Sequence, residues 1–147
     1  MPQKKKLQSY DSEPHANLIG VGIGPNGSIA NPPTRFAAHP DDIVVWAIGN
    51  TSGQPITVTL FEFYRKKSDG DDKGDPGDAV MPFNWLVSNI VQIDDKALGL
   101  IAAQRDPNFK VRGIIHDRVS YTIRVESRAP VNPFPPIDYD PDGDIKP

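Results

Sequence analysis

The sequence predicts a single all-β domain, an antiparallel β-sandwich followed by a proline-rich extended tail. Sixteen of the 147 residues are proline, and this density favours strands joined by rigid loops over long helices. About seven short segments, spaced roughly ten residues apart and bounded by turn residues, have the apolar runs or alternation of strands. The chain is long enough to bury a core without disulfides, and it contains no cysteine.

The first half of the chain carries the clearest strand signals. Residues 17–23 alternate apolar side chains with glycine, and Asn26-Gly27 then predicts a hairpin turn with residues 28–30 as the return strand. Residues 41–50 form a β-branched and aromatic run bounded by Asp and Asn, as expected for a central strand. Residues 56–64 alternate almost without a break, which predicts another long strand.

The second half is read in the same way. Residues 65–78 are so rich in charge, Gly and Asp that they predict an exposed loop. Residues 89–93 predict a strand, and residues 96–104 fit either helix or strand, with strand favoured by the neighbouring segments. Residues 120–126 alternate cleanly and predict the closing strand. The aromatic residues expected in the core are Trp46, Phe61 and Tyr121.

These signals divide the chain into three parts. Residues 1–16 are expected to form a flexible N-terminal arm, residues 17–127 the sandwich, and residues 128–147 a proline-rich acidic tail. Proline biases such a tail to an extended polyproline II backbone. The tail is expected either to lie along its own sandwich or to reach a partner.

Two strands carry a family resemblance. His39-Pro40-Asp41-Asp42 opens the apolar strand that contains Trp46 and is followed by Asn50, and residues 121–125 read Tyr-Thr-Ile-Arg-Val. This order resembles the cupredoxin-like family, with its "D-x-V-x-W" and closing "Y-x-I-x-V" strands, although an immunoglobulin-like sandwich shares most of these features. The resemblance covers about residues 17–127 and implies a β-sandwich.

The copper ligands of that family are not all present. A blue-copper site takes two His, one Cys and usually a distant Met. The loop before the last strand, residues 109–118, contains His116 but neither Cys nor Met. We therefore expect no blue-copper electron transfer.

Other chemistry has weak support in the sequence. His15, His39 and His116 have no metal-ligand spacing, and no serine stands in a nucleophile-elbow context, so we expect no enzyme activity. Asp138, Asp140 and Asp142, with Gly143, match the opening half of a calcium loop, but the chain ends before the twelfth position, where a bidentate Glu is required. Calcium is thus the one cofactor left open.

Binding is the function class that the sequence favours. The tail presents Val131, Phe134, Ile137 and Tyr139 on a backbone with little entropy left to lose, which suits a partner's groove. We expect a structural or binding module with a protein partner or a homo-oligomer, and the alternative is a metal-dependent module or enzyme that uses the acidic clusters.

Charge and hydropathy narrow the partners and the location. The net charge of −3 gives no electrostatic footprint for nucleic acid. No window approaches the ~18 apolar residues of a membrane span. The lysine run at residues 4–6 lacks the apolar stretch of a secretory signal, so we expect this chain, as given, to be cytoplasmic or an already processed form.

Overall fold

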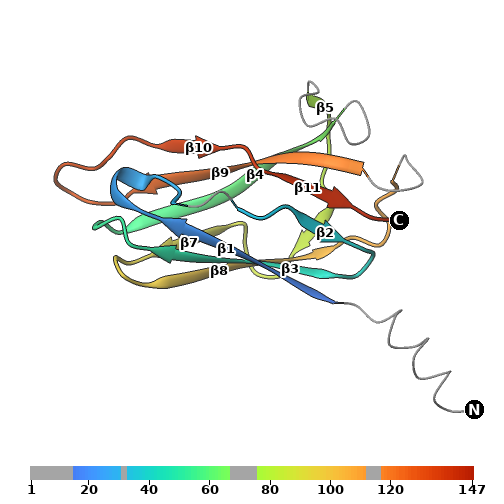
Figure 1. The fold of residues 1–147 in the computed structure, drawn as a ribbon, viewed down its shortest axis with the longest axis horizontal. Coiled ribbons are helices and arrows are strands. Elements are labelled where there is room, and N and C mark those ends of the chain that lie inside the picture. Colours follow the sequence, from blue (N-terminus) through green and yellow to red (C-terminus); the bar gives the residue numbers. More distant parts are fainter. Residues whose placement is uncertain (1–14, 31–32, 67–75, 112–116) are drawn as a thin grey trace, which may run out of the picture.

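The computed structural model describes residues 15–30, 33–66, 76–111 and 117–147, and within them strands dominate (Figure 1). No described residue lies in a helix that is long and apolar enough to cross a membrane. The elements are β1 (Ala16–Ile23), the short 3-10 turn η1 (Pro25–Gly27), β2 (Phe36–Ala38), β3 (Ile43–Asn50), β4 (Ile56–Lys66), β5 (Pro76–Ala79), β6 (Phe83–Trp85), β7 (Ile90–Ile93), β8 (Leu98–Arg105), β9 (Asp117–Ser127), β10 (Ile137–Tyr139) and β11 (Asp142–Ile145).

Two sheets pack into a sandwich, which confirms the predicted fold class. The smaller sheet has the order β1-β3-β8-β6. The larger sheet is built on β9 and β4, with β10 and β11 following one another along one side of β9, β2 beyond β11, and β7 and β5 along the far side of β4. Among the described strands, β1 with β3 and β2 with β11 pair in parallel, and the other ladders are antiparallel.

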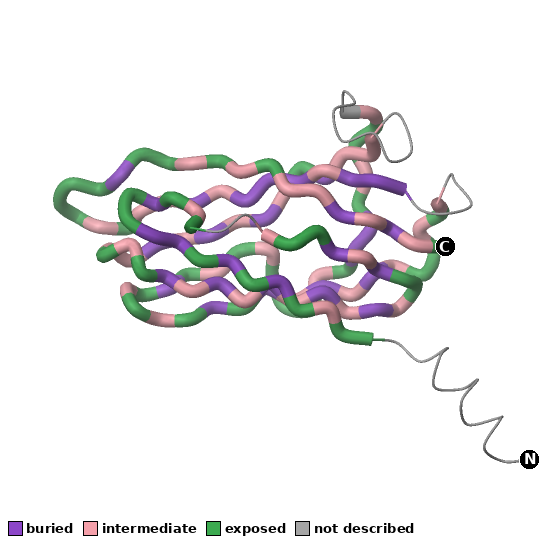
Figure 2. The backbone as a smooth tube through the Cα atoms, viewed as in Figure 1, coloured by how far each residue is buried: buried purple, intermediate pink, exposed green. Residues whose placement is uncertain are grey.

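The core lies between the sheets and follows the period-2 pattern of the strands, so that buried and more exposed residues alternate along β1, β3 and β8 (Figure 2). Trp46 and Tyr121 are buried as predicted. They also join the sheets, because Trp46 Nε1 donates a hydrogen bond of 3.0 Å to Tyr121 Oη. Their rings lie in a cluster of aromatic residues that also contains Phe36, Phe63, Phe83 and Trp85.

Phe61 is not a core residue, contrary to the prediction; it is only half-buried. The alternation that runs through Ile56 and Leu60 breaks at Glu62, which has a positive φ of 55°. There the register of β4 against β9 shifts, as it does at a β-bulge. Phe63 therefore enters the core with 2% exposure. Phe61 precedes the shift and has the outward parity of Thr57 and Thr59, so the unbroken alternation places it on the outer surface.

Three other local predictions have different outcomes. Asn26-Gly27 is part of the 3-10 turn η1, and the expected return strand is reduced to a single bridge between Ile23 and Ile29. Residues 96–104, ambiguous in the sequence, contain the strand β8, as the neighbouring segments favoured. In the predicted loop at 65–78, β4 continues to Lys66 and β5 begins at Pro76, while residues 67–75 lie outside the described residues.

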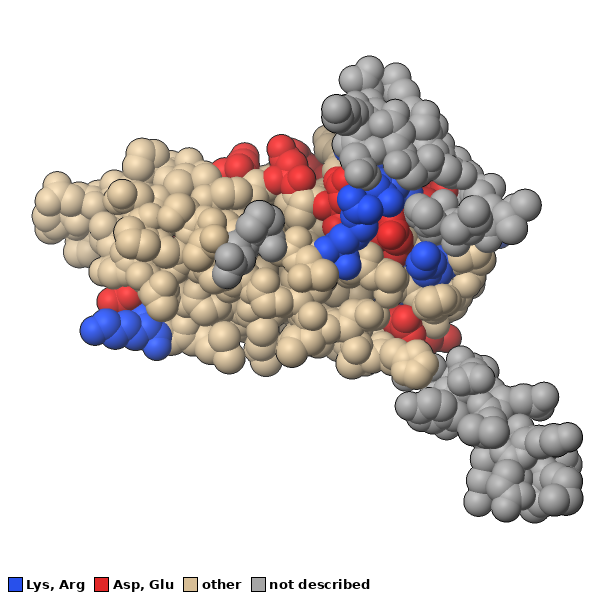
Figure 3. Space-filling view, viewed as in Figure 1, with Lys and Arg blue, Asp and Glu red and all other residues tan. Residues whose placement is uncertain are grey.

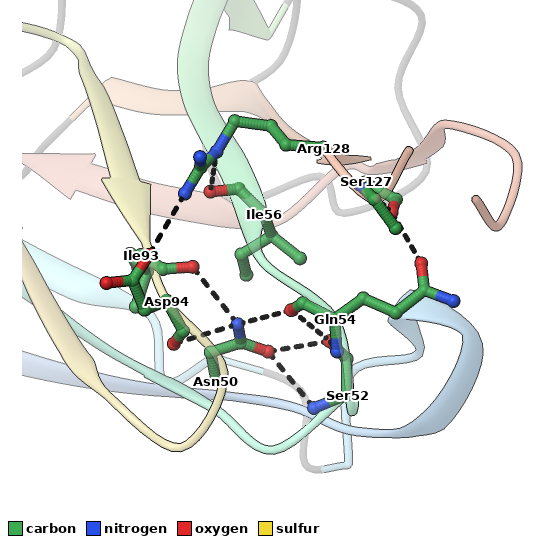
Figure 4. Close-up of polar contacts among 9 residues, drawn as sticks. Asn50, Ser52, Gln54, Ile56, Ile93, Asp94, Ser127 and Arg128 are labelled. Atoms are coloured by element: carbon green, nitrogen blue, oxygen red, sulfur yellow. Dashed lines mark hydrogen bonds and ion pairs between the residues drawn. The ribbon is translucent and has the colours of Figure 1, made fainter. Parts of the chain in front are cut away.

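Asn50, at the end of β3, is a structural residue. It is 1% exposed and joins two turns (Figure 4). Its Nδ2 donates to the carbonyl oxygens of Gln54, Ile93 and Asp94 at 2.8, 3.2 and 3.1 Å, and its Oδ1 accepts from the backbone and hydroxyl of Ser52. Because a buried amide costs free energy when it is unpaired, this network explains the polar residue that ends an apolar strand.

The proline-rich segment after residue 127 contributes to the sandwich itself. β10 pairs with residues 123–125 of β9, and β11 lies between β9 and β2. Gln54 ties the connection down, since its Nε2 donates to Asn132 O at 3.1 Å and its Oε1 accepts from Ser127 Oγ and the Phe134 N–H. The expected tail therefore lies along its own body, and its last residues are strands of the larger sheet.

Candidate functional site

The two outer faces of the sandwich differ in chemistry. On the smaller sheet, alternate residues of each strand point away from the core, and the register aligns them in rows across β1, β3 and β8, with Leu86 beside Ala102 just after β6. We call this set the apolar face: Ala16, Leu18, Gly20 and Gly22 from β1; Ile43, Val45, Ala47 and Gly49 from β3; Leu98, Leu100 and Ala102 from β8; and Leu86.

None of these residues has a charged or hydrogen-bonding side chain, and three of the leucines are well exposed. Leu18 is 74%, Leu98 68% and Leu100 59% exposed. Gln104, which pairs with Asn84, borders the face at one end, and Lys96, two residues before Leu98, borders it at the other. In Figure 3 the flank of the molecule below β1 shows charged groups near its two ends and none along the stretch between them.

The outer face of the larger sheet is mostly polar, as is usual for a solvated sheet, although Ile90 of β7 lies beside Thr59 and is 49% exposed. It presents Thr57 and Thr59 from β4 and Arg124 from β9. Arg124 Nε donates to Asp138 Oδ1 at 2.8 Å and its guanidinium lies 4.8 Å from the centre of the Phe61 ring. The hydrogen bond from Arg124 lowers the pKa of the Asp138 carboxyl. This contrast makes the apolar face the unusual surface of the molecule.

The apolar face has a raised part and a low part. Leu98 and Leu100 form a ridge along β8, and the neighbouring positions on β1 and β3, Gly20, Gly22, Ala47 and Gly49, form a trough beside it. A Cβ added at Gly20 or Gly49 would meet nothing within 4 Å, so the fold itself gives no packing reason for glycine there. Glycine in an exposed strand weakens it and often marks the close approach of another backbone or ligand.

A glycine of the core shows the opposite situation. At Gly143 in β11, an added Cβ would lie 2.1 Å from ring atoms of Phe36, so internal packing requires the glycine. No such contact inside the chain requires glycine at Gly20 or Gly49.

The dimensions of the apolar face follow from strand geometry. With a rise of about 3.3 Å per residue and a strand spacing of about 4.8 Å, the face covers roughly 20 by 20 Å, or about 400 Å². Contiguous apolar patches of ~300–600 Å² are the largest found on typical monomers and are often functional. The apolar face is accordingly our candidate binding surface.

Of the four tail residues predicted to bind a partner, three pack at least partly against the chain itself and one is exposed. Phe134, 7% exposed, packs over Gly27, and Tyr139 Oη accepts from the Ile29 N–H at 2.9 Å and donates to the Gly27 oxygen at 3.1 Å. Ile137 pairs with Val125 and is half-buried, whereas Val131 is 72% exposed. Partner binding by these residues stays a prediction.

The predicted calcium ligands face separate partners. Asp138 binds Arg124, Asp140 accepts from Thr122 Oγ1 at 3.2 Å, and Asp142 lies 3.9 Å from Lys66 Nζ. Within the described ranges, no group of three or more His, Cys, Asp or Glu residues converges to hold a metal ion.

The described histidines also face separate surroundings. His39 Nδ1 lies 3.6 Å from the Asp42 carboxylate, which also accepts the backbone N–H groups of His15 and His39. Asp42 thereby fixes the turn before β3. His116 lies outside the described residues.

An open groove of about 570 Å³ lies beside the β10–β11 connection. Its lining includes Ile29, Arg35, Tyr139, Asp140 and Asp142. Since one cation faces two carboxylates and apolar rings there, the groove favours no single class of ligand and forms no nucleophile–base pair.

Comparison with known proteins gives the fold and nothing finer. No family model matches the sequence, and no curated protein matches it. Among solved structures, the CupB2 chaperone of Pseudomonas aeruginosa is similar, with a TM-score of 0.52 and 15% identity over 78% of this chain and 53% of that chain. The CsuC–CsuE chaperone–tip adhesion subunit pre-assembly complex of Acinetobacter baumannii matches with a TM-score of 0.51 and 12% identity, over 76% of this chain and 53% of that chain.

A multicopper oxidase, McoA of Aquifex aeolicus, also matches, with a TM-score of 0.43 and 13% identity over 92% of this chain and 30% of that chain. The chain spans about half the length of the chaperone-system chains it matches. At these identities the likeness shows the β-sandwich fold alone, and the closer cupredoxin-like assignment stays a prediction.

The sequence contains a signal for the apolar face. β3 is apolar at both parities, and Leu98 and Leu100 alternate with buried residues of β8. Near-continuous apolar runs are typical of strands that are buried on both faces. The same double pattern is what made residues 96–104 ambiguous between helix and strand.

Proposed function

We propose that this β-sandwich is a non-catalytic module that binds a protein through the apolar face. The observation that carries the proposal is the uncharged, unpartnered outer surface of the smaller sheet, with exposed leucines beside glycines that the fold does not need. A protein surface that covered it would remove this apolar area from water at about 25 cal/mol per Å².

The fold comparisons support the same class of function. The solved structures with TM-scores above 0.5 include chaperones, and one of them was determined with an adhesion subunit. Sandwiches of this shape can therefore serve as protein-binding modules. The partner in our proposal is recognised by an apolar surface of its own, without charged groups at its centre.

Site-specific photocrosslinking tests the proposal. A benzophenone amino acid is placed at Leu100, on the ridge of the apolar face, or at the control position Gln92, exposed on β7 of the other sheet. Expressed in the producing cell, the Leu100 probe should give a covalent protein adduct of one defined mass, and the Gln92 probe should not.

A second substitution on the same face sharpens the result. Leu18→Asp, which adds a charge at a position 74% exposed, should leave the fold intact and remove the adduct formed by the Leu100 probe. Equal crosslinking from both probe positions, or no protein adduct from Leu100, would show that the apolar face is not a protein-binding surface.

A further inference from the structure

The apolar face has the properties of a surface that is complementary to itself. Its ridge, Leu98 and Leu100, runs along β8, and its trough of Gly20, Gly22, Ala47 and Gly49 runs along β1 and β3, parallel to the ridge. In a two-fold interface the same patch occurs on both sides, so that residue i contacts residue j and j contacts i. A two-fold axis between ridge and trough places each copy's leucines over the other copy's glycines.

Charge is consistent with this pairing. Burying a charge without a partner is costly, and a face with charges of one sign would repel its own copy. The apolar face has no charged side chain to bury, so two copies can meet without leaving an unpaired charge. The polar pair at its end, Gln104 and Asn84, lies at the rim, where water can still reach it.

The area buried between the two copies sets the expected strength of their association. The roughly 400 Å² in projection rises when the protruding leucines are counted, so two copies face to face would bury on the order of 1,000 Å², near the lower bound of specific interfaces. Such an interface has its sheets about 10 Å apart, as in the packing of one sheet on another within a sandwich. A micromolar rather than nanomolar dissociation constant is expected.

We infer that the occupant of the apolar face is a second copy of this chain, bound face to face about a two-fold axis. The inference rests on the proposed function and names its partner. The smaller sheets of the two copies then form the middle layers of a four-layer assembly, and the polar faces of the larger sheets remain in water.

Sedimentation equilibrium of the purified full chain tests the inference. From low to high micromolar concentration the wild type should shift from the 16.1 kDa monomer to twice that mass, and no further. Leu100→Asp buries two charges per dimer, one from each copy, and should weaken association at least about 100-fold. The control Gln92→Asp adds the same charge on the other sheet and should change the dissociation constant less than about twofold.

Gly20→Phe distinguishes the contribution of shape complementarity from that of hydrophobicity. A Cβ at this position meets nothing within 4 Å, so the monomer should fold normally, as checked by circular dichroism and thermal unfolding. The new ring makes the face more apolar but fills the trough, and it should weaken the dimer at least about tenfold.

Three outcomes would overturn the dimer. These are a wild type that stays monomeric, mass that grows without limit as concentration rises, and tighter association of Gly20→Phe. A monomeric purified chain that still gives the Leu100 crosslink in cells would leave the proposed function standing with a different protein as the partner. If the wild type is monomeric and the Leu100 probe also gives no crosslink, the proposed function is wrong as well.

Discussion

The hydrogen bond from Trp46 to Tyr121 is a sensitive place to test the account of the core. Tyr121→Phe removes one hydroxyl oxygen and leaves the ring, which stacks on Phe63 with centroids 5.1 Å apart. Trp46 is fully buried, so its indole N–H would lose its acceptor without gaining water. The variant therefore tests an inter-sheet polar contact with little change in packing.

The expected cost follows from that burial. A buried donor that is left unpaired costs about 1–3 kcal/mol, and we expect Tyr121→Phe to lower the free energy of unfolding by about 2 kcal/mol at pH 8. Tyr64→Phe, at a half-buried position in β4, is the matched control and should change it by less than about 0.5 kcal/mol.

The difference in the free energy of unfolding between wild type and Tyr121→Phe should shrink at high pH. Burial raises the pKa of the Tyr121 phenol well above the ordinary value of about 10, so the folded protein keeps the neutral form that the unfolded chain loses. The stability from this group is complete below pH 10 and is lost as pH rises toward the folded pKa. Wild type then loses stability relative to Tyr121→Phe by up to about 1.4 kcal/mol per pH unit, and the two curves should meet near pH ~11.5.

Urea unfolding followed by tryptophan fluorescence measures both effects. The variants are compared at one protein concentration, because association stabilises the folded state by mass action, and the m-value should be unchanged. A loss below about 0.5 kcal/mol at pH 8, or a gap that stays constant from pH 9 to 11, would refute the assigned hydrogen bond or the buried neutral phenol.

Two further predictions concern how residues 128–147 are held on the sandwich. Phe134→Ala should cost about 3 kcal/mol, because its ring covers Gly27 and is 7% exposed; an effect below about 1 kcal/mol in thermal or urea unfolding would mean that the segment is not anchored there. Gly143→Ala places a Cβ 2.1 Å from the Phe36 ring and should cost about 1–3 kcal/mol by overpacking, measured in the same way, whereas an unchanged midpoint would contradict the close contact of β11 with β2.

Much of the sandwich could be predicted, because alternation is a local property that the sheets preserve. Residues 120–126 show this: Tyr121, Ile123 and Val125 are all buried. Phe63 shows where the alternation changes face. One residue in the left-handed region, Glu62, moves every later side chain of β4 to the other face, and nothing in the local pattern distinguishes a Glu that lies at a bulge from one that does not.

The strands β10 and β11 could not be predicted from their own residues. Ile137 to Ile145 include Pro141 and four aspartates, a composition that disfavours strands. They are extended because β9 offers a long free side and because Phe134 and Tyr139 fix the path of the chain. This is tertiary context overriding local propensity. The apolar face required the same context, since its rows exist only once β1, β3 and β8 are in register.

The position of β11 also sets the order in which this fold can be completed. Phe36 of β2 pairs in the larger sheet with Gly143, so β2 has no strand partner in this sheet until residues 143–145 have been synthesised. Contacts this distant in sequence slow folding, because the intervening chain must first be ordered. Until then the edge of β9 is open to strands of other molecules. Nascent chains of this protein should therefore depend on chaperone protection during synthesis more than a helical domain of equal length.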